Sequence, residues 1–170
     1  MSGGCGGCSE DEDERTLVAG DKVREMTAAS AARGAGLRGF KLLFATCGSV
    51  MQLSVNSPKG VIAEVAGVAT AAGCQLVASC DLALAADNAR FATPGVNIGL
   101  FCSTPMVALS RNVAKKHAME MLLTGEMVSA EKALQIGLIN RSIAPSQLTT
   151  ETMAMADTIA GKSAMTVAVG

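Results

Sequence analysis

The pattern of hydrophobic and polar positions divides the chain near residue 40. Residues 1–39 open with MSGGCGGCSEDEDE, a glycine-rich run followed by a block of acidic residues. Such a composition buries too little apolar area to offset the entropy lost on ordering. We therefore predict a disordered leader over residues 1–39 and one folded domain over residues 40–170.

From residue 40 onward, the apolar positions predict an alternation of helices and short strands. Apolar side chains first recur at helical spacing, at Phe40, Leu43, Phe44, Cys47, Val50 and Met51. Residues 61–68 then predict a buried strand and residues 71–79 a helix of small residues. A second strand is predicted over residues 82–86 and a short third strand over residues 90–93. Further helices are expected over residues 103–110, 113–124, 129–136 and 145–159. This order indicates an α/β fold with a helical C-terminal part.

Serine, glycine and proline mark the predicted ends of these later helices. Ser103 and Ser129 occupy N-cap positions, where a hydroxyl accepts a hydrogen bond from a free backbone N–H. Gly125 stands at a C-cap position. Pro145 is expected to open the last helix and Gly161 to end it.

Composition and charge exclude two classes of partner. The net charge is -1 and the chain has no Trp or Tyr. Nucleic-acid binding needs a basic surface and stacking platforms, so no nucleic-acid partner is expected. The uncharged run Val65–Cys80, rich in Ala and Gly, is shorter than the roughly 20 apolar residues that cross a bilayer, so no membrane span is expected.

The six cysteines are expected to be reduced thiols. No apolar signal segment precedes them, and the acidic block is the opposite of an Arg-rich mitochondrial transit peptide. Cys5-Gly-Gly-Cys8 has the spacing of a zinc or redox pair, but a zinc site needs four ligands. The chain has one such pair and one histidine, His117, so no metal site is predicted.

Three other short motifs are explained more simply by structure than by catalysis or modification. His117 follows Lys115 and Lys116, which favours a solvated helix position over a catalytic one. The S-x-x-K pattern from Ser129 to Lys132 lacks its companion motifs, and helix capping accounts for Ser129. Asn140-Arg-Ser142 is a glycosylation sequon that stays unused without secretion.

The strongest chemical candidate is the predicted junction of strand and helix at Thr70. The first N–H groups of a helix lack internal partners and carry the positive end of its dipole. Ala71, Ala72 and Gly73 are small enough for a ligand to approach this backbone. The junction could therefore be the floor of an active site or only a tightly packed helix start.

The residues around this junction carry a resemblance to a known family. The segments VIAEVAGVATAAGCQLVASCDLALAADNARFATPGVNIGL and LLTGEMVSAEKALQIGLIN resemble the enoyl-CoA hydratase/isomerase (crotonase) superfamily over residues 41–170. The resemblance implies a spiral of β-β-α units with C-terminal helices that trimerise. The family's first strands, one oxyanion donor and its adenine-binding loop precede the matched part, so we expect a partial crotonase-like fold without its N-terminal half.

The resemblance also implies which residues form the site. The family polarises an acyl-CoA thioester carbonyl with two backbone N–H groups, and Ala72 matches the position of one of them. Ala71 and Gly73 flank it at the expected substrate-binding surface. Gln75 and Gly95 occupy the positions of the family's two glutamates. No cofactor is implied beyond the coenzyme A thioester that acts as substrate or ligand.

The replaced glutamates and one changed segment indicate an altered function. An amide at residue 75 and no side chain at residue 95 remove the acid and base of hydration. The family's P-G-x-G-G segment reads Cys102-Ser103-Thr104-Pro105-Met106, which predicts an altered acyl pocket. We expect a family member of fatty-acid (acyl-CoA) metabolism without hydratase activity.

Two alternatives and two assignments remain open. The chain could be a non-catalytic acyl-CoA-binding or scaffold protein that joins full-length relatives, or a truncated product without independent function. The resemblance implies a mitochondrial location, whereas the N-terminus shows no transit peptide and leaves the cytoplasm open. A trimeric homo-oligomer is expected if the family fold is completed.

Overall fold

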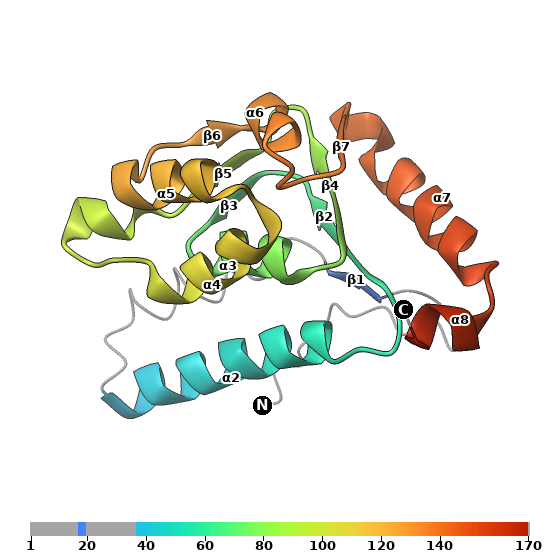
Figure 1. The fold of residues 1–170 in the computed structure, drawn as a ribbon, viewed down its shortest axis with the longest axis horizontal. Coiled ribbons are helices and arrows are strands. Elements are labelled where there is room, and N and C mark those ends of the chain that lie inside the picture. Colours follow the sequence, from blue (N-terminus) through green and yellow to red (C-terminus); the bar gives the residue numbers. More distant parts are fainter. Residues whose placement is uncertain (1–16, 20–36, 170) are drawn as a thin grey trace, which may run out of the picture.

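The computed structural model describes residues 17–19 and 37–169. Its first long element is helix α2 (Leu37–Val55), which lies beneath the rest of the fold (Figure 1). The predicted leader over residues 1–39 contains strand β1 (Leu17–Ala19) and the first residues of α2. The other residues of that range lie outside the described part, so the boundary at residue 39 stays a prediction.

Two β-β-α units follow α2 and form the centre of the molecule. The first comprises β2 (Val61–Val65), β3 (Val68–Thr70) and α3 (Ala72–Ser79). The second comprises β4 (Leu82–Ala86), β5 (Arg90–Ala92), the 3-10 turn η1 (Pro94–Ile98) and α4 (Ser103–Asn112). β2 pairs in parallel with β4, and β3 pairs in parallel with β5. This repeat confirms the predicted β-β-α spiral.

Each unit therefore contributes one strand to each of two sheets. The four-stranded sheet has the order β1-β2-β4-β7, with β7 at Arg141–Ile143. The three-stranded sheet has the order β3-β5-β6, with the two-residue strand β6 (Val128–Ser129) antiparallel to β5. Because parallel strands end at the same edge of a sheet, the elements that follow β3 and β5 start side by side.

Four helices make up most of the chain after α4, which confirms the predicted helical C-terminal part. They are α5 (Lys115–Thr124), α6 (Ala130–Gln135), α7 (Leu148–Ala160) and α8 (Ala164–Val169). Figure 1 shows α7 on the side of β2 and β4 that faces away from α2, α3 and α4. None of the helices within the described ranges is long and apolar enough to cross a membrane.

The packing of α7 explains a charged residue within a core strand. The β2 side chains are buried except Glu64, which is half-buried. The Thr149 hydroxyl of α7 donates to the Glu64 carboxylate over 2.8 Å. Alternation along the strand thus directs Glu64 away from the neighbouring core residues and toward a polar partner.

Three capping predictions are confirmed and one is wrong. Gly161 ends α7, as predicted. The Ser129 hydroxyl accepts from the Lys132 N–H at the start of α6, and Gly125 ends α5 with φ 63°. Ser103, however, is the first helical residue of α4, and the N-cap is Cys102. The Met106 N–H bonds to the Cys102 carbonyl, which begins the helix one residue earlier than the serine predicts.

The structure corrects several predicted boundaries. The strand predicted over residues 61–68 is two strands, because the chain crosses between sheets at Ala66 and Gly67. The helix expected from residue 113 begins at Lys115. Pro145 opens the short 3-10 turn η2 (Pro145–Gln147), and α7 starts after it. The short elements β6, β7, η1 and α8 have no counterpart in the sequence prediction, since each lacks a full hydrophobic period.

Candidate functional site

The junction predicted at Thr70 is a strained turn from a strand into a helix. β3 ends at Thr70, and α3 begins at Ala72. Ala71 between them adopts φ 49° and ψ -111°, the one non-glycine residue with positive φ among the described positions. Such a conformation costs of order 1–3 kcal/mol and persists only when the surrounding structure holds it.

A hydrogen bond to the neighbouring strand holds Ala71 in place. Its N–H donates to the Ala92 carbonyl oxygen over 2.9 Å, and its own carbonyl accepts from the Gln75 N–H over 2.9 Å. No side chain caps α3. The N–H groups of Ala72 and Gly73 have no partner among the described residues, so the helix start presents free donors at the positive end of its dipole.

The structure brings the second predicted position to the same edge of the sheet. In the register of β3 and β5, Thr70 lies opposite Ala92, so α3 and η1 leave adjacent strand ends. Gly95 is a buried residue within η1. Ala71, Ala72 and Gly73 are therefore gathered with Gly95 in one region, although more than 20 residues separate them in sequence.

Gln75 lies one turn into α3 and is half-buried. Its carbonyl oxygen accepts from the Ser79 hydroxyl over 2.8 Å. Its side-chain amide makes no hydrogen bond to another described residue. An amide donates and accepts hydrogen bonds but does not take up a proton at neutral pH, so it can orient a polar group without acting as a base.

Three residues of the changed segment after η1 pack inward. Cys102 and Pro105 are buried and Met106 is packed against the core, whereas Ser103 and Thr104 are exposed. Burial raises the pKa of the Cys74 thiol of α3 to about 12, and the nearby Cys102 adds to this rise. Cys74 is therefore a neutral thiol near neutral pH.

The remaining motifs have structural roles. The His117 Nδ1 lies 3.6 Å from the Glu120 carboxylate on the exposed side of α5. The Asn140 amide oxygen accepts from the Ala83 N–H over 2.8 Å, which ties β4 to the start of β7. The Cys5–Cys8 pair lies outside the described residues. Within the described ranges, no group of three or more His, Cys, Asp or Glu side chains is placed to hold a metal ion.

Two cavities lie away from the α3 junction. One of about 150 Å³ lies between the Pro58–Gly60 turn and the end of α7, and one of about 270 Å³ lies between α5 and α6. Neither is lined by Ala72, Gln75 or Gly95.

The part of the site that sequence reasoning missed is the backbone around it. The Ala92 carbonyl that holds Ala71 and the loop that covers Gly95 carry no side-chain signature. The Gly99 in NIGLFC, which has φ 75°, was the one available sign of a turn.

Known sequences include relatives of this chain that cover the strands and helices around the α3 junction. A family model described as enoyl-CoA hydratase/isomerase matches residues 16–169. Enoyl-CoA hydratase domain-containing protein 3, mitochondrial, of Homo sapiens is 55% identical over 128 residues, which cover 75% of this chain and 42% of the relative. The protein of the same name from Xenopus laevis is 56% identical over 128 residues, covering 75% and 44%. The chain spans less than half the length of these curated relatives.

Solved structures agree with the sequence comparison. Human enoyl-CoA hydratase domain-containing protein 3 aligns with a TM-score of 0.73 and 50% identity, covering 87% of this chain and 56% of that one. An enoyl-CoA hydratase of Mycobacterium smegmatis aligns with a TM-score of 0.73 and 51% identity, covering 91% and 58%. With the β-β-α spiral and the family match over most of its length, this chain belongs to the enoyl-CoA hydratase/isomerase family.

Proposed function

We propose that this chain binds acyl-CoA thioesters, with the Ala72 N–H donating to the thioester carbonyl, and that it has no hydratase activity. The observation that carries the proposal is the uncapped start of α3, fixed by the Ala71–Ala92 hydrogen bond. A backbone donor aimed at a developing oxyanion is worth a few kcal/mol of stabilisation, about 10²–10³ in rate. Ala71 carries only a methyl group and Gly73 has no side chain, so both leave room for a ligand around this donor.

The loss of hydration follows from the two replaced glutamates. Adding water to an enoyl-CoA needs one group to remove a proton from water and another to protonate the substrate. Gln75 and Gly95 supply neither group. General acid–base catalysis typically contributes about 10²–10⁴-fold, so binding and carbonyl polarisation are the functions that this set of residues supports.

The names of the relatives support a proposed setting for this activity. The human and Xenopus relatives are named mitochondrial, and the chain shares more than half of its aligned residues with them. We accordingly place it in acyl-CoA metabolism of fatty acids and in the mitochondrion, with a trimeric assembly of the family type. Immunolocalisation checks the mitochondrial assignment, and sedimentation of the purified chain checks the trimeric assembly.

The first test is a thermal melt followed by far-UV circular dichroism, since the chain has no Trp or Tyr. Crotonyl-CoA at a hundredfold excess over its dissociation constant should stabilise the native state by about 2.7 kcal/mol and raise the midpoint. Coenzyme A alone serves as the control for binding without the acyl carbonyl. An unchanged midpoint with crotonyl-CoA would contradict the proposal.

A second test uses a variant that removes the Ala72 donor. Replacing the amide at Ala72 by an ester, with lactic acid in place of alanine, removes the N–H and keeps the side chain. The ligand-induced rise in midpoint should shrink while the midpoint without ligand changes little. Loss of enoyl absorbance in crotonyl-CoA should stay at the buffer rate for both proteins, and measurable hydration by the unmodified chain would contradict the proposed lack of hydratase activity.

A further inference from the structure

The loop after η1 turns back onto Gly95. The Leu100 N–H donates to the Gly95 carbonyl oxygen over 2.9 Å, and the Gly99 N–H donates to the Val96 carbonyl oxygen over 3.2 Å. The positive φ of Gly99 lets the backbone reverse at this point. As a result, the Leu100 carbonyl and the Cys102 side chain lie directly over the Gly95 Cα.

No side chain fits at residue 95 in this arrangement. A Cβ built on Gly95 would overlap the Leu100 carbonyl oxygen and lie 2.7 Å from the Cys102 sulfur. One of these neighbours is backbone, which cannot move aside by changing a rotamer. The other belongs to a side chain that is 8% exposed and whose residue is the N-cap of α4.

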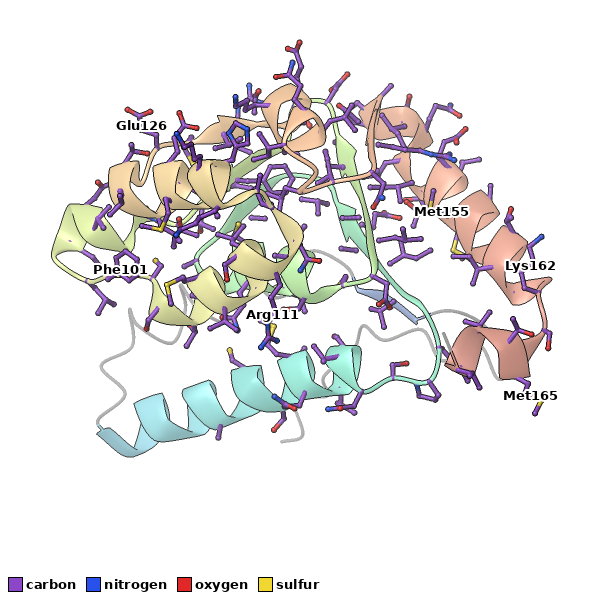
Figure 2. All side chains as sticks on the ribbon, in the orientation of Figure 1. Phe101, Arg111, Glu126, Met155, Lys162 and Met165 are labelled. Atoms are coloured by element: carbon purple, nitrogen blue, oxygen red, sulfur yellow. The ribbon has the colours of Figure 1, made fainter. Side chains whose placement is uncertain are left out.

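Contacts on the other side of η1 hold the loop against movement. The buried Thr93 hydroxyl donates to the Met121 carbonyl oxygen over 2.9 Å. The Asn97 amide donates to the Gly125 carbonyl oxygen over 3.4 Å at the end of α5. These contacts fix the turn between α5 and the start of α4. Figure 2 shows Phe101, in the same loop, at the end of the molecule opposite Lys162 and Met165.

We infer that the segment Leu100–Cys102 occupies the space into which a residue-95 side chain would project, and that it prevents any carboxylate from being placed there. This inference rests on the proposed function, because it concerns which groups can surround an acyl-CoA at the α3 helix start. The segment is a specificity-determining element. It restricts the site to reactions and binding events that use the Ala72 donor and Gln75 without a second acid.

A direct consequence concerns the restoration of the family glutamates. Gln75→Glu alters a half-buried side chain on α3 and should fold normally. Gly95→Glu requires the loop to be displaced, so the double variant should melt at a lower temperature and remain without hydratase activity. The absence of acid–base catalysis at residue 95 therefore has two causes, the missing carboxylate and the loop that occupies its space.

The deciding experiment compares Gly95→Ala with Gly48→Ala in full-length chains by far-UV thermal melts. A Cβ at Gly48, in α2, meets nothing within 4 Å, and a helical Gly-to-Ala change is favourable there. Gly95→Ala should lower the midpoint by roughly 5–10 °C, as expected for overpacking in a core. An equal midpoint for the two variants would overturn the inference.

A rescue keeps the inference testable if Gly95→Ala does not fold. Inserting one glycine between Gly99 and Leu100 lengthens the loop and should restore folding or most of the lost midpoint. Failure of this insertion to restore either would show that the loop is not the cause. The readout needs no ligand, so it is distinguishable from the crotonyl-CoA melt that tests the proposed function.

Discussion

The Ala71 N–H donates a 2.9 Å hydrogen bond to the Ala92 carbonyl oxygen and fixes the strained residue before α3. The bond joins the ends of β3 and β5, two strands that come from successive β-β-α units. It sets the direction in which α3 leaves the sheet, and with it the direction of the Ala72 N–H. The geometry of the candidate donor therefore depends on a backbone contact rather than on any functional side chain.

Ala71→Gly should raise the thermal midpoint. Glycine adopts positive φ without a Cβ clash, which removes a strain of order 1–3 kcal/mol at the cost of about 0.5–1 kcal/mol of chain entropy. The same change at Ala154, an exposed residue within α7, should lower stability by about 1 kcal/mol. Melts of both variants check the opposite signs, and a loss of stability in Ala71→Gly would show that the turn is unstrained.

Thr149→Val should destabilise the fold through Glu64. The variant removes the 2.8 Å hydrogen bond to the half-buried Glu64 carboxylate, which should cost about 0.5–1.5 kcal/mol because the contact is solvent-exposed and water replaces part of it. Thr158→Val on the same helix is the control, since the Thr158 hydroxyl is exposed and bonds only within α7. Urea unfolding should separate the two variants, and equal midpoints would mean that the Glu64 contact contributes nothing.

Gly125→Ala should cost more stability than Gly137→Ala. Both glycines have positive φ, at 63° and 79°. A Cβ at Gly125 would lie 2.9 Å from Val96, whereas at Gly137 it would meet nothing within 4 Å. The difference in unfolding free energy between the variants thus measures the packing of η1 on α5, and a difference near zero would contradict that packing.

Stability should fall as pH rises above 9. Burial raises the pKa of the Cys74 thiol to about 12, and burial, with a smaller contribution from Asp81, raises the pKa of Cys80 to about 12. A group whose folded pKa is raised contributes stability that is complete below its unfolded pKa and lost on the way to its folded pKa. Both thiols ionise first in the unfolded chain, so unfolding becomes easier between about pH 9 and pH 12.

Melts of the parent and of Cys74→Ala and Cys80→Ala across this pH range check the effect. Each variant should be less stable at neutral pH, because it leaves a small cavity, and should lose less stability as the pH rises. Cys47, a half-exposed cysteine of α2, provides the control substitution. If both variants lose stability with rising pH as steeply as the parent, groups other than these two thiols cause the loss at alkaline pH.

The candidate site was only partly foreseeable from the sequence. The order and small size of Thr70, Ala71, Ala72 and Gly73 predicted a helix start with accessible donors. The positive φ of Ala71 was not predictable, because alanine rarely adopts it and the hydrogen bond that holds it runs from the Ala71 N–H to Ala92 of a distant strand. The steric closure over Gly95 was likewise hidden, since it involves the backbone of Leu100.

Sequence by itself determined the elements and their types wherever hydrophobic periods were long enough. It predicted α3 and β4 closely, the caps at Ser129 and Gly125, and the family spiral through a resemblance over residues 41–170. Tertiary structure alone decided the split of residues 61–68 between two sheets and the placement of β7 beside β4. Local side chains encode periodicity and capping, whereas strand pairing and backbone contacts between distant segments depend on the whole chain.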